Sequence, residues 1–137
     1  MTTVLQADPA AAELSGKVLY IEDQTTNYAL VEAILTQHPK VQLIHAETGL
    51  EGVRMVRSER PDFVLLDMHL PDISGLDVVR MLSDEIAEHQ LRVTILTADS
   101  LTLDIIKAMS LGAFEYLVKP VRVQALESSM RRALTRQ

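Results

Sequence analysis

The length, composition and charge of the chain restrict the class of protein to which it can belong. With 137 residues, 47% of them hydrophobic and 23% charged, the sequence is typical of one globular domain and not of a disordered chain. The absence of cysteine excludes disulfides, thiolate metal sites and a cysteine nucleophile, and the net charge of −6 argues against direct binding to nucleic acid.

The N-terminal segment is predicted to be a tail or linker. It shows no strong hydrophobic period, and Asp8 and Glu13 without a basic start argue against a secretory signal. No apolar run approaches the roughly 20 residues that span a bilayer. We therefore expect a tail over residues 1–15, a single domain over residues 16–137, and a cytoplasmic protein that does not enter a membrane.

Five segments are predicted to be strands. The apolar runs at residues 18–21, 63–66, 93–96 and 116–118 are nearly continuous, which is typical of strands buried on both faces. The segment at residues 41–45 is less uniform and suits an edge strand. The segments that separate these five strands show a different hydrophobic period.

Between and after the strands, apolar residues recur at helical spacing. Helix by helix, these residues are Leu30, Val31, Ile34 and Leu35; Leu50, Val53 and Val56; Leu76, Val79, Leu82 and Ile86; Ile105 and Met109; and Leu126, Met130 and Ala133 or Leu134. Thr48 with Glu51, and Ser74 with Asp77, have the three-residue spacing typical of helix N-termini. Strand and helix alternate five times, which predicts a parallel sheet with right-handed crossovers and helices on both faces.

Polar residues follow four of the predicted strands directly. They are Glu22 and Asp23, Asp67, Thr97, and Lys119. In an open parallel sheet, ligands bind beyond the carboxyl ends of the strands, where these residues would meet. Carboxylates gathered in a crevice repel one another, so some take up protons or a cation neutralises them. Oxygen ligands without cysteine favour Mg²⁺, with Mn²⁺ as a substitute.

The cationic and hydroxyl groups beside this cluster suggest the chemistry of Asp67. Lys119 would supply a point charge and Thr97 a hydroxyl donor. Both make sense if Asp67 gains further negative charge by accepting a phosphoryl group, because that transfer depends mostly on positioning and on charge neutralisation.

The residues that follow the strands also resemble those of a known family. Glu22–Asp23, DMHLPDISG around Asp67, Thr97–Ala98 and Lys119–Pro120 occur in the order found in receiver domains of two-component response regulators. The resemblance covers roughly residues 16–135. It implies a flavodoxin-like (βα)₅ three-layer fold with a parallel five-stranded sheet of order 2-1-3-4-5.

The resemblance also implies a role for each site residue. Asp67 is the phosphoacceptor, Thr97 the switch hydroxyl, Tyr116 the switch aromatic and Lys119 the phosphoryl-binding lysine. Glu22, Asp23 and Asp67 organise Mg²⁺ with the backbone carbonyl of His69, and the Lys119–Pro120 peptide bond is cis.

Partners follow from the same resemblance. A histidine kinase or phosphotransfer protein donates the phosphoryl group. The domain is not a conventional enzyme, although it assists its own phosphorylation and slow dephosphorylation. A downstream protein binds a face made by the fourth helix, fifth strand and fifth helix, and we expect a monomer or weak homodimer. The candidate residues of this face are Leu101, Leu103, Ile105, Met109, Tyr116, Val121 and Arg122.

Other interpretations stay open for these residues. Thr97 and Tyr116 also fit an ordinary strand end and an ordinary core, and the apolar residues of the fourth helix also fit plain core. A receiver-like module could bind partners without phosphorylation, and the chain could be part of a hybrid kinase. An aspartate-nucleophile phosphatase of the haloacid-dehalogenase type would require an acid two residues after Asp67, where this chain has His69.

Overall fold

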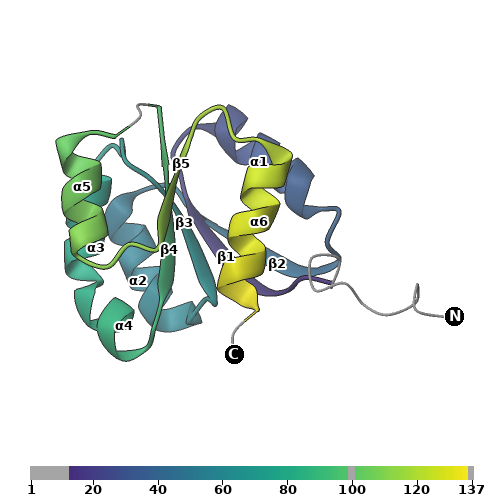
Figure 1. Ribbon diagram of the computed structural model, residues 1–137, viewed down its shortest axis with the longest axis horizontal. Coiled ribbons are helices and arrows are strands. Elements are labelled where there is room, and N and C mark those ends of the chain that lie inside the picture. The colour runs from purple at the N-terminus through teal and green to yellow at the C-terminus, as the bar shows by residue number, and fades with distance from the viewer. Residues whose placement is uncertain (1–12, 99–100, 136–137) are drawn as a thin grey trace, which may run out of the picture.

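A five-stranded parallel sheet forms the middle layer of the molecule (Figure 1). The computed structural model describes residues 13–98 and 101–135. The strands are β1 (Ser15–Ile21), β2 (Lys40–Ala46), β3 (Phe63–Asp67), β4 (Arg92–Thr97) and β5 (Glu115–Val118). Their order is β2-β1-β3-β4-β5 and all neighbouring pairs are parallel, which confirms the predicted fold class and strand order.

Helices cover both faces of this sheet. They are α1 (Thr25–Leu35), α2 (Gly49–Glu59), α3 (Gly75–Met81), α4 (Ser83–Glu88), α5 (Leu103–Ser110) and α6 (Val123–Leu134). In Figure 1, α1 and α6 lie on one side of the sheet, and α2, α3 and α5 lie on the other. Each face is sealed by its own apolar cluster, and the strands contribute side chains alternately to the two clusters.

The strands in the middle of the sheet are buried as their sequences predict. Every residue of β3 is buried, and β2 is an edge strand as expected. The prediction that residues 116–118 are buried on both faces is wrong. Because β5 forms the second edge of the sheet, its residues are half-buried and Val118 is 44% exposed.

The helix starts agree with the sequence pattern. The N–H of Glu51 donates to Oγ1 of Thr48 at 3.1 Å, and the N–H of Asp77 donates to Oγ of Ser74 at 3.1 Å. Both hydroxyls therefore satisfy backbone donors that have no partner within the helix.

The predicted third helix is divided into α3 and α4. Leu82 leaves helical geometry, with φ −97° and ψ 12°, and the carbonyl of Met81 accepts a hydrogen bond from Nη2 of Arg57 at 2.9 Å. Leu82 nevertheless stays fully buried. The hydrophobic spacing therefore continues across the break, which is why the sequence predicts one helix.

Three further differences concern which side chains are buried. Leu30 and Leu50, predicted on the inner faces of α1 and α2, are 45% and 46% exposed, because each helix buries only the stripe that faces the sheet. Leu14, within the predicted tail, is buried, and β1 begins at Ser15. The tail prediction for residues 1–12 lies outside the described residues. Of the helices in the described ranges, none has the length and apolar character needed to cross a membrane.

Candidate functional site

The strand register brings the predicted polar residues to one edge of the sheet. Ile21 of β1 pairs with Leu66 of β3, so the residues that follow them, Glu22 and Asp67, emerge side by side. Asp67 is in turn the register partner of Leu96, one residue before Thr97 on β4. The structure therefore places Glu22, Asp23, Asp67, Thr97 and Lys119 at the carboxyl ends of neighbouring strands, where open parallel sheets bind ligands.

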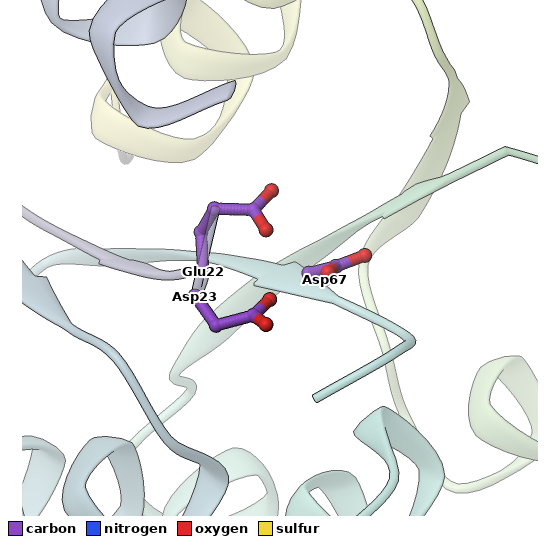
Figure 2. Close-up of side chains that lie close together, drawn as sticks. All are labelled: Glu22, Asp23 and Asp67. Carbon is purple, nitrogen blue, oxygen red and sulfur yellow. The ribbon is translucent and has the colours of Figure 1, made fainter. Parts of the chain in front are cut away.

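Three carboxylates converge at this edge. Glu22, Asp23 and Asp67 each offer an oxygen, and these oxygens lie within 4.8 Å of one another. Figure 2 shows the carboxylates of Glu22 and Asp23 turned toward the side on which Asp67 lies. Glu22 is fully buried and Asp67 is 4% exposed, whereas Asp23 is exposed to solvent. A ligand can therefore reach the cluster from solvent on the side where Asp23 lies.

Among the described residues, Lys119 is a cation that contacts this cluster. Its Nζ lies 3.1 Å from Oδ1 of Asp67 and 3.3 Å from Oε1 of Glu22. One ammonium against three carboxylates, two of them buried, leaves an excess of negative charge at this edge of the sheet. All three anionic ligands are hard oxygen donors. The site therefore fits a divalent cation such as Mg²⁺, which takes one or two carboxylates and keeps several waters.

Two features hold the loop between β3 and α3 in place: the close approach of Gly75 to Asp67, and the hydrogen bonds of Asp72. A side chain at Gly75 would place its Cβ 2.9 Å from the carbonyl oxygen of Asp67 and 2.8 Å from Cα of Met68, so only glycine fits there. The carboxylate of Asp72 accepts the N–H groups of Gly49 at 2.8 Å and Leu50 at 2.9 Å, at the start of α2. Burial would raise the pKa of Asp72, but these backbone hydrogen bonds outweigh it and lower the pKa.

A hollow lies beside the residues that follow Asp67. Its volume is about 330 Å³, and its lining includes Thr97 and His69. The side chain of Thr97 is buried at the end of β4, whereas His69 is exposed. The hollow extends from the residues that follow Asp67 to the start of α5, where Leu103 and Asp104 line it.

Tyr20 is a residue of this site that the sequence analysis did not single out. Its hydroxyl donates a hydrogen bond to Oε1 of Glu22 at 3.0 Å. Burial and then the Glu22 carboxylate raise its pKa far above the usual range, so the hydroxyl keeps its proton. The signal was present in the sequence, because residues two apart on a strand face the same side and Tyr20 precedes Glu22 by two.

Tyr116 and Pro120 flank the site on β5 and after it. Tyr116 is half-buried and packs against the apolar cluster under α2, α3 and α5, so its ring contributes to the core. Its role as a switch stays a prediction. The Lys119–Pro120 peptide bond is cis.

The predicted signalling face requires one correction. Ile105 is fully buried and cannot belong to an exposed face, whereas Ile106, which the prediction omitted, is 45% exposed. Leu101 and Leu103 are 58% and 65% exposed, and Met109 is partly buried. The fourth predicted helix is apolar on several sides, so spacing alone did not separate the buried side from the exposed one.

The fold and the site together define a doubly wound α/β protein with an acidic cluster at the carboxyl ends of its strands, which is suited to phosphoryl transfer. The family model for the response regulator receiver domain matches residues 18–131. The chain therefore belongs to the family of response regulator receiver domains.

Curated relatives include proteins of two lengths. Protein PilH of Pseudomonas aeruginosa is 32% identical over 111 residues, which cover 81% of this chain and 91% of PilH. Transcriptional regulatory protein AfsQ1 of Streptomyces coelicolor is 33% identical over 119 residues, which cover 87% of this chain and 51% of AfsQ1. The chain thus spans about half the length of some relatives and nearly all of others.

Solved structures agree with this assignment. The receiver domain of a sensor histidine kinase from Pseudomonas aeruginosa PAO1 has a TM-score of 0.77 and 25% identity, covering 88% of this chain and 98% of its own. That structure has a magnesium ion coordinated in its active site cleft.

Proposed function

We propose that this chain accepts one phosphoryl group on Asp67 from a histidine kinase or phosphotransfer protein, and that the modified domain changes its affinity for a protein partner. The observation that supports this most directly is the position of Asp67. It is almost buried, its Oδ1 lies 3.1 Å from Nζ of Lys119, and its carboxylate clusters with those of Glu22 and Asp23.

In the transfer, a carboxylate oxygen of Asp67 forms a bond to phosphorus as the bond between phosphorus and the donor's imidazole nitrogen breaks. Lys119 is placed to neutralise charge on the incoming phosphoryl oxygens because its Nζ already contacts Asp67. Glu22, Asp23, Asp67 and the backbone carbonyl of His69 would hold Mg²⁺, or Mn²⁺ in its place. When bound, the cation neutralises phosphoryl charge.

The output follows from the charge added at Asp67. A new dianionic group competes for Lys119 and for the hydroxyl of Thr97, and Tyr116 follows Thr97. The face that includes Leu101, Leu103 and Ile106 then presents a different surface to a partner. These three side chains are exposed, as a binding face requires. The domain loses the phosphoryl group by its own slow hydrolysis and does not turn over small phosphate esters.

The test is intact mass after incubation with acetyl phosphate and a rapid acid quench, with and without Mg²⁺. The expected result is one added phosphoryl group that requires Mg²⁺ and disappears in Asp67→Asn. Asp84→Asn is the matched control, because it makes the same change at an exposed carboxylate in the first turn of α4. It should keep the adduct.

Release of inorganic phosphate distinguishes the remaining outcomes. Asp67-dependent release of phosphate from acetyl phosphate without a visible adduct would indicate a short-lived phosphoaspartate. Neither an adduct nor Asp67-dependent release would overturn the proposal in favour of a module that binds without phosphorylation. Rapid multiple turnover of small phosphate esters would favour the phosphatase.

A further inference from the structure

Three aromatic side chains, Tyr20, Tyr28 and His45, form a ring of contacts that begins and ends at Glu22. The hydroxyl of Tyr20 donates to Oε1 of Glu22 at 3.0 Å. The ring of Tyr28 stacks on Tyr20 at a centroid distance of 5.8 Å and on His45 at 3.8 Å. Nε2 of His45 lies 2.7 Å from the backbone carbonyl oxygen of Glu22, and because a carbonyl only accepts, this nitrogen donates. Glu22 is therefore held at both its side chain and its backbone.

The fold assembles this ring from three separate elements. Tyr20 and His45 are register partners on β1 and β2, so their side chains face the same side of the sheet. Glu22 follows Tyr20 by two residues and faces that side as well. Tyr28 lies in the first turn of α1, which begins at Thr25, and completes the stack above the two strands.

Both oxygens of the Glu22 carboxylate accept hydrogen bonds from other groups of the protein. Oε1 accepts from Tyr20 and from Nζ of Lys119 at 3.3 Å, and Oε2 accepts from the N–H of Gln24 at 3.2 Å. Glu22 is fully buried, and the oxygens of a buried carboxylate require hydrogen-bond donors, which also fix its position. Without the Tyr20 hydroxyl, Oε1 would depend on Lys119, which also serves Asp67.

We propose that Tyr20, Tyr28 and His45 are positioning residues that hold Glu22 in the geometry in which the acidic cluster binds a divalent cation. This inference rests on the proposed Mg²⁺ site. Groups that orient metal ligands through hydrogen bonds typically change metal affinity by 10- to 100-fold when they are removed. The Tyr20 hydroxyl acts on the carboxylate, and the His45–Tyr28 pair acts on the Glu22 backbone.

The test compares Mg²⁺ affinity by titration calorimetry in the unphosphorylated full chain and its Tyr20→Phe variant. Tyr20→Phe removes only the hydroxyl and keeps the ring that packs on Tyr28. The expected result is a rise of about tenfold in the Mg²⁺ dissociation constant. The matched control is Ser129→Ala, which removes a buried hydroxyl hydrogen bond to Thr94 (2.9 Å) on β4, away from the three carboxylates. This control should lower stability and leave Mg²⁺ affinity unchanged.

A double-mutant cycle separates positioning from general packing. In a Glu22→Gln background, Tyr20→Phe should change Mg²⁺ affinity by less than about twofold, because the hydroxyl acts through the Glu22 carboxylate. His45→Leu removes the hydrogen bond to the Glu22 backbone carbonyl and should also weaken Mg²⁺ binding. The Mg²⁺ affinity of this variant tests the positioning role if Tyr20→Phe does not fold.

The outcomes distinguish this inference from the proposed function. A wild-type chain that does not bind Mg²⁺ would overturn both. Wild-type binding together with unchanged affinity in Tyr20→Phe and His45→Leu would overturn only the positioning role. An equal loss of affinity from Tyr20→Phe in both backgrounds would also overturn it, because the effect would then not pass through Glu22.

Discussion

Charged side chains are balanced at one end of the sheet and unbalanced at the other. At the amino ends of the strands, charged groups meet in pairs. Nζ of Lys17 lies 3.2 Å from Oε1 of Glu59, its backbone N–H donates to Asp62 at 2.8 Å, and Nε of Arg57 donates to Glu85 at 2.9 Å. At the carboxyl ends, three carboxylates lie together, and the ammonium group of Lys119 contacts two of them, Glu22 and Asp67.

This difference separates charges that hold the fold together from charges that serve a ligand. A paired charge at a partly solvated surface contributes modestly to stability and leaves no requirement for a further ion. An unbalanced cluster costs stability until a cation joins it. The residue pairs at the amino ends thus stabilise the fold, and the excess negative charge at the carboxyl ends allows a cation to bind.

The largest expected effect is at the exposed carboxylate of the cluster. Asp23→Asn should abolish the gain in the free energy of unfolding that saturating Mg²⁺ gives the wild type. That gain is about 2.7 kcal/mol at 100 times the dissociation constant. Without Mg²⁺, the variant should be more stable by about 0.5 kcal/mol, because one repulsive charge is removed. Urea unfolding with and without Mg²⁺ measures both quantities.

The control for Asp23→Asn is Asp84→Asn, which removes an exposed carboxylate from the first turn of α4. It should keep the full Mg²⁺-dependent gain. If Asp23→Asn also kept that gain, the excess charge at the carboxyl ends would not be the cation site.

The reverse behaviour is expected at the amino ends. Asp62→Ala removes the acceptor of the Lys17 N–H and should lower the free energy of unfolding by about 1 kcal/mol. Because Asp62 lies at the opposite end of the strands, the loss should be the same with and without Mg²⁺. A Mg²⁺-dependent loss, read from the same urea curves, would contradict the separation of the two ends.

The contrast between the two ends could be predicted largely from the sequence, because the end of an apolar run predicts the end of a buried strand. Glu22, Asp67 and Thr97 each follow such a run, and parallel pairing brings those positions together. The family resemblance supplied the strand order, which spacing alone does not fix. The exposure of Val118 followed from that order and was missed when its segment was read by itself.

The sequence analysis missed two contacts, each made by a single polar atom. Tyr20 sits inside an apolar run and looks like core until its hydroxyl is seen to reach Glu22. The break at Leu82 keeps its hydrophobic spacing and is visible only where Arg57 of α2 donates to the carbonyl of Met81. Periodicity carries no information about the contact of Arg57, which joins residues far apart in the sequence. The contact of Tyr20 did leave a signal, because the two-residue spacing places its side chain on the same side of the strand as Glu22.

The smallest expected effect concerns the charge of Arg57. Burial would raise the pKa of Glu85, but its hydrogen bond with Arg57 and the nearby positive charge lower the pKa below the ordinary value of 4.5. A carboxyl group whose pKa is lower in the folded state stabilises the fold above about pH 4.5, and this contribution is lost as the pH falls through the folded-state pKa.

Arg57→Gln keeps a donor for the Met81 carbonyl and removes the charge. It should cost about 0.5 kcal/mol at neutral pH, because Arg57 is half exposed, and this cost should shrink toward zero in acid as Glu85 protonates in both proteins. Urea unfolding of both proteins at about pH 6 and about pH 3 measures the difference. A cost that stayed constant or grew in acid would show that Arg57 acts through the Met81 carbonyl alone. The pairing of charge at the amino ends would then not contribute to stability at this position.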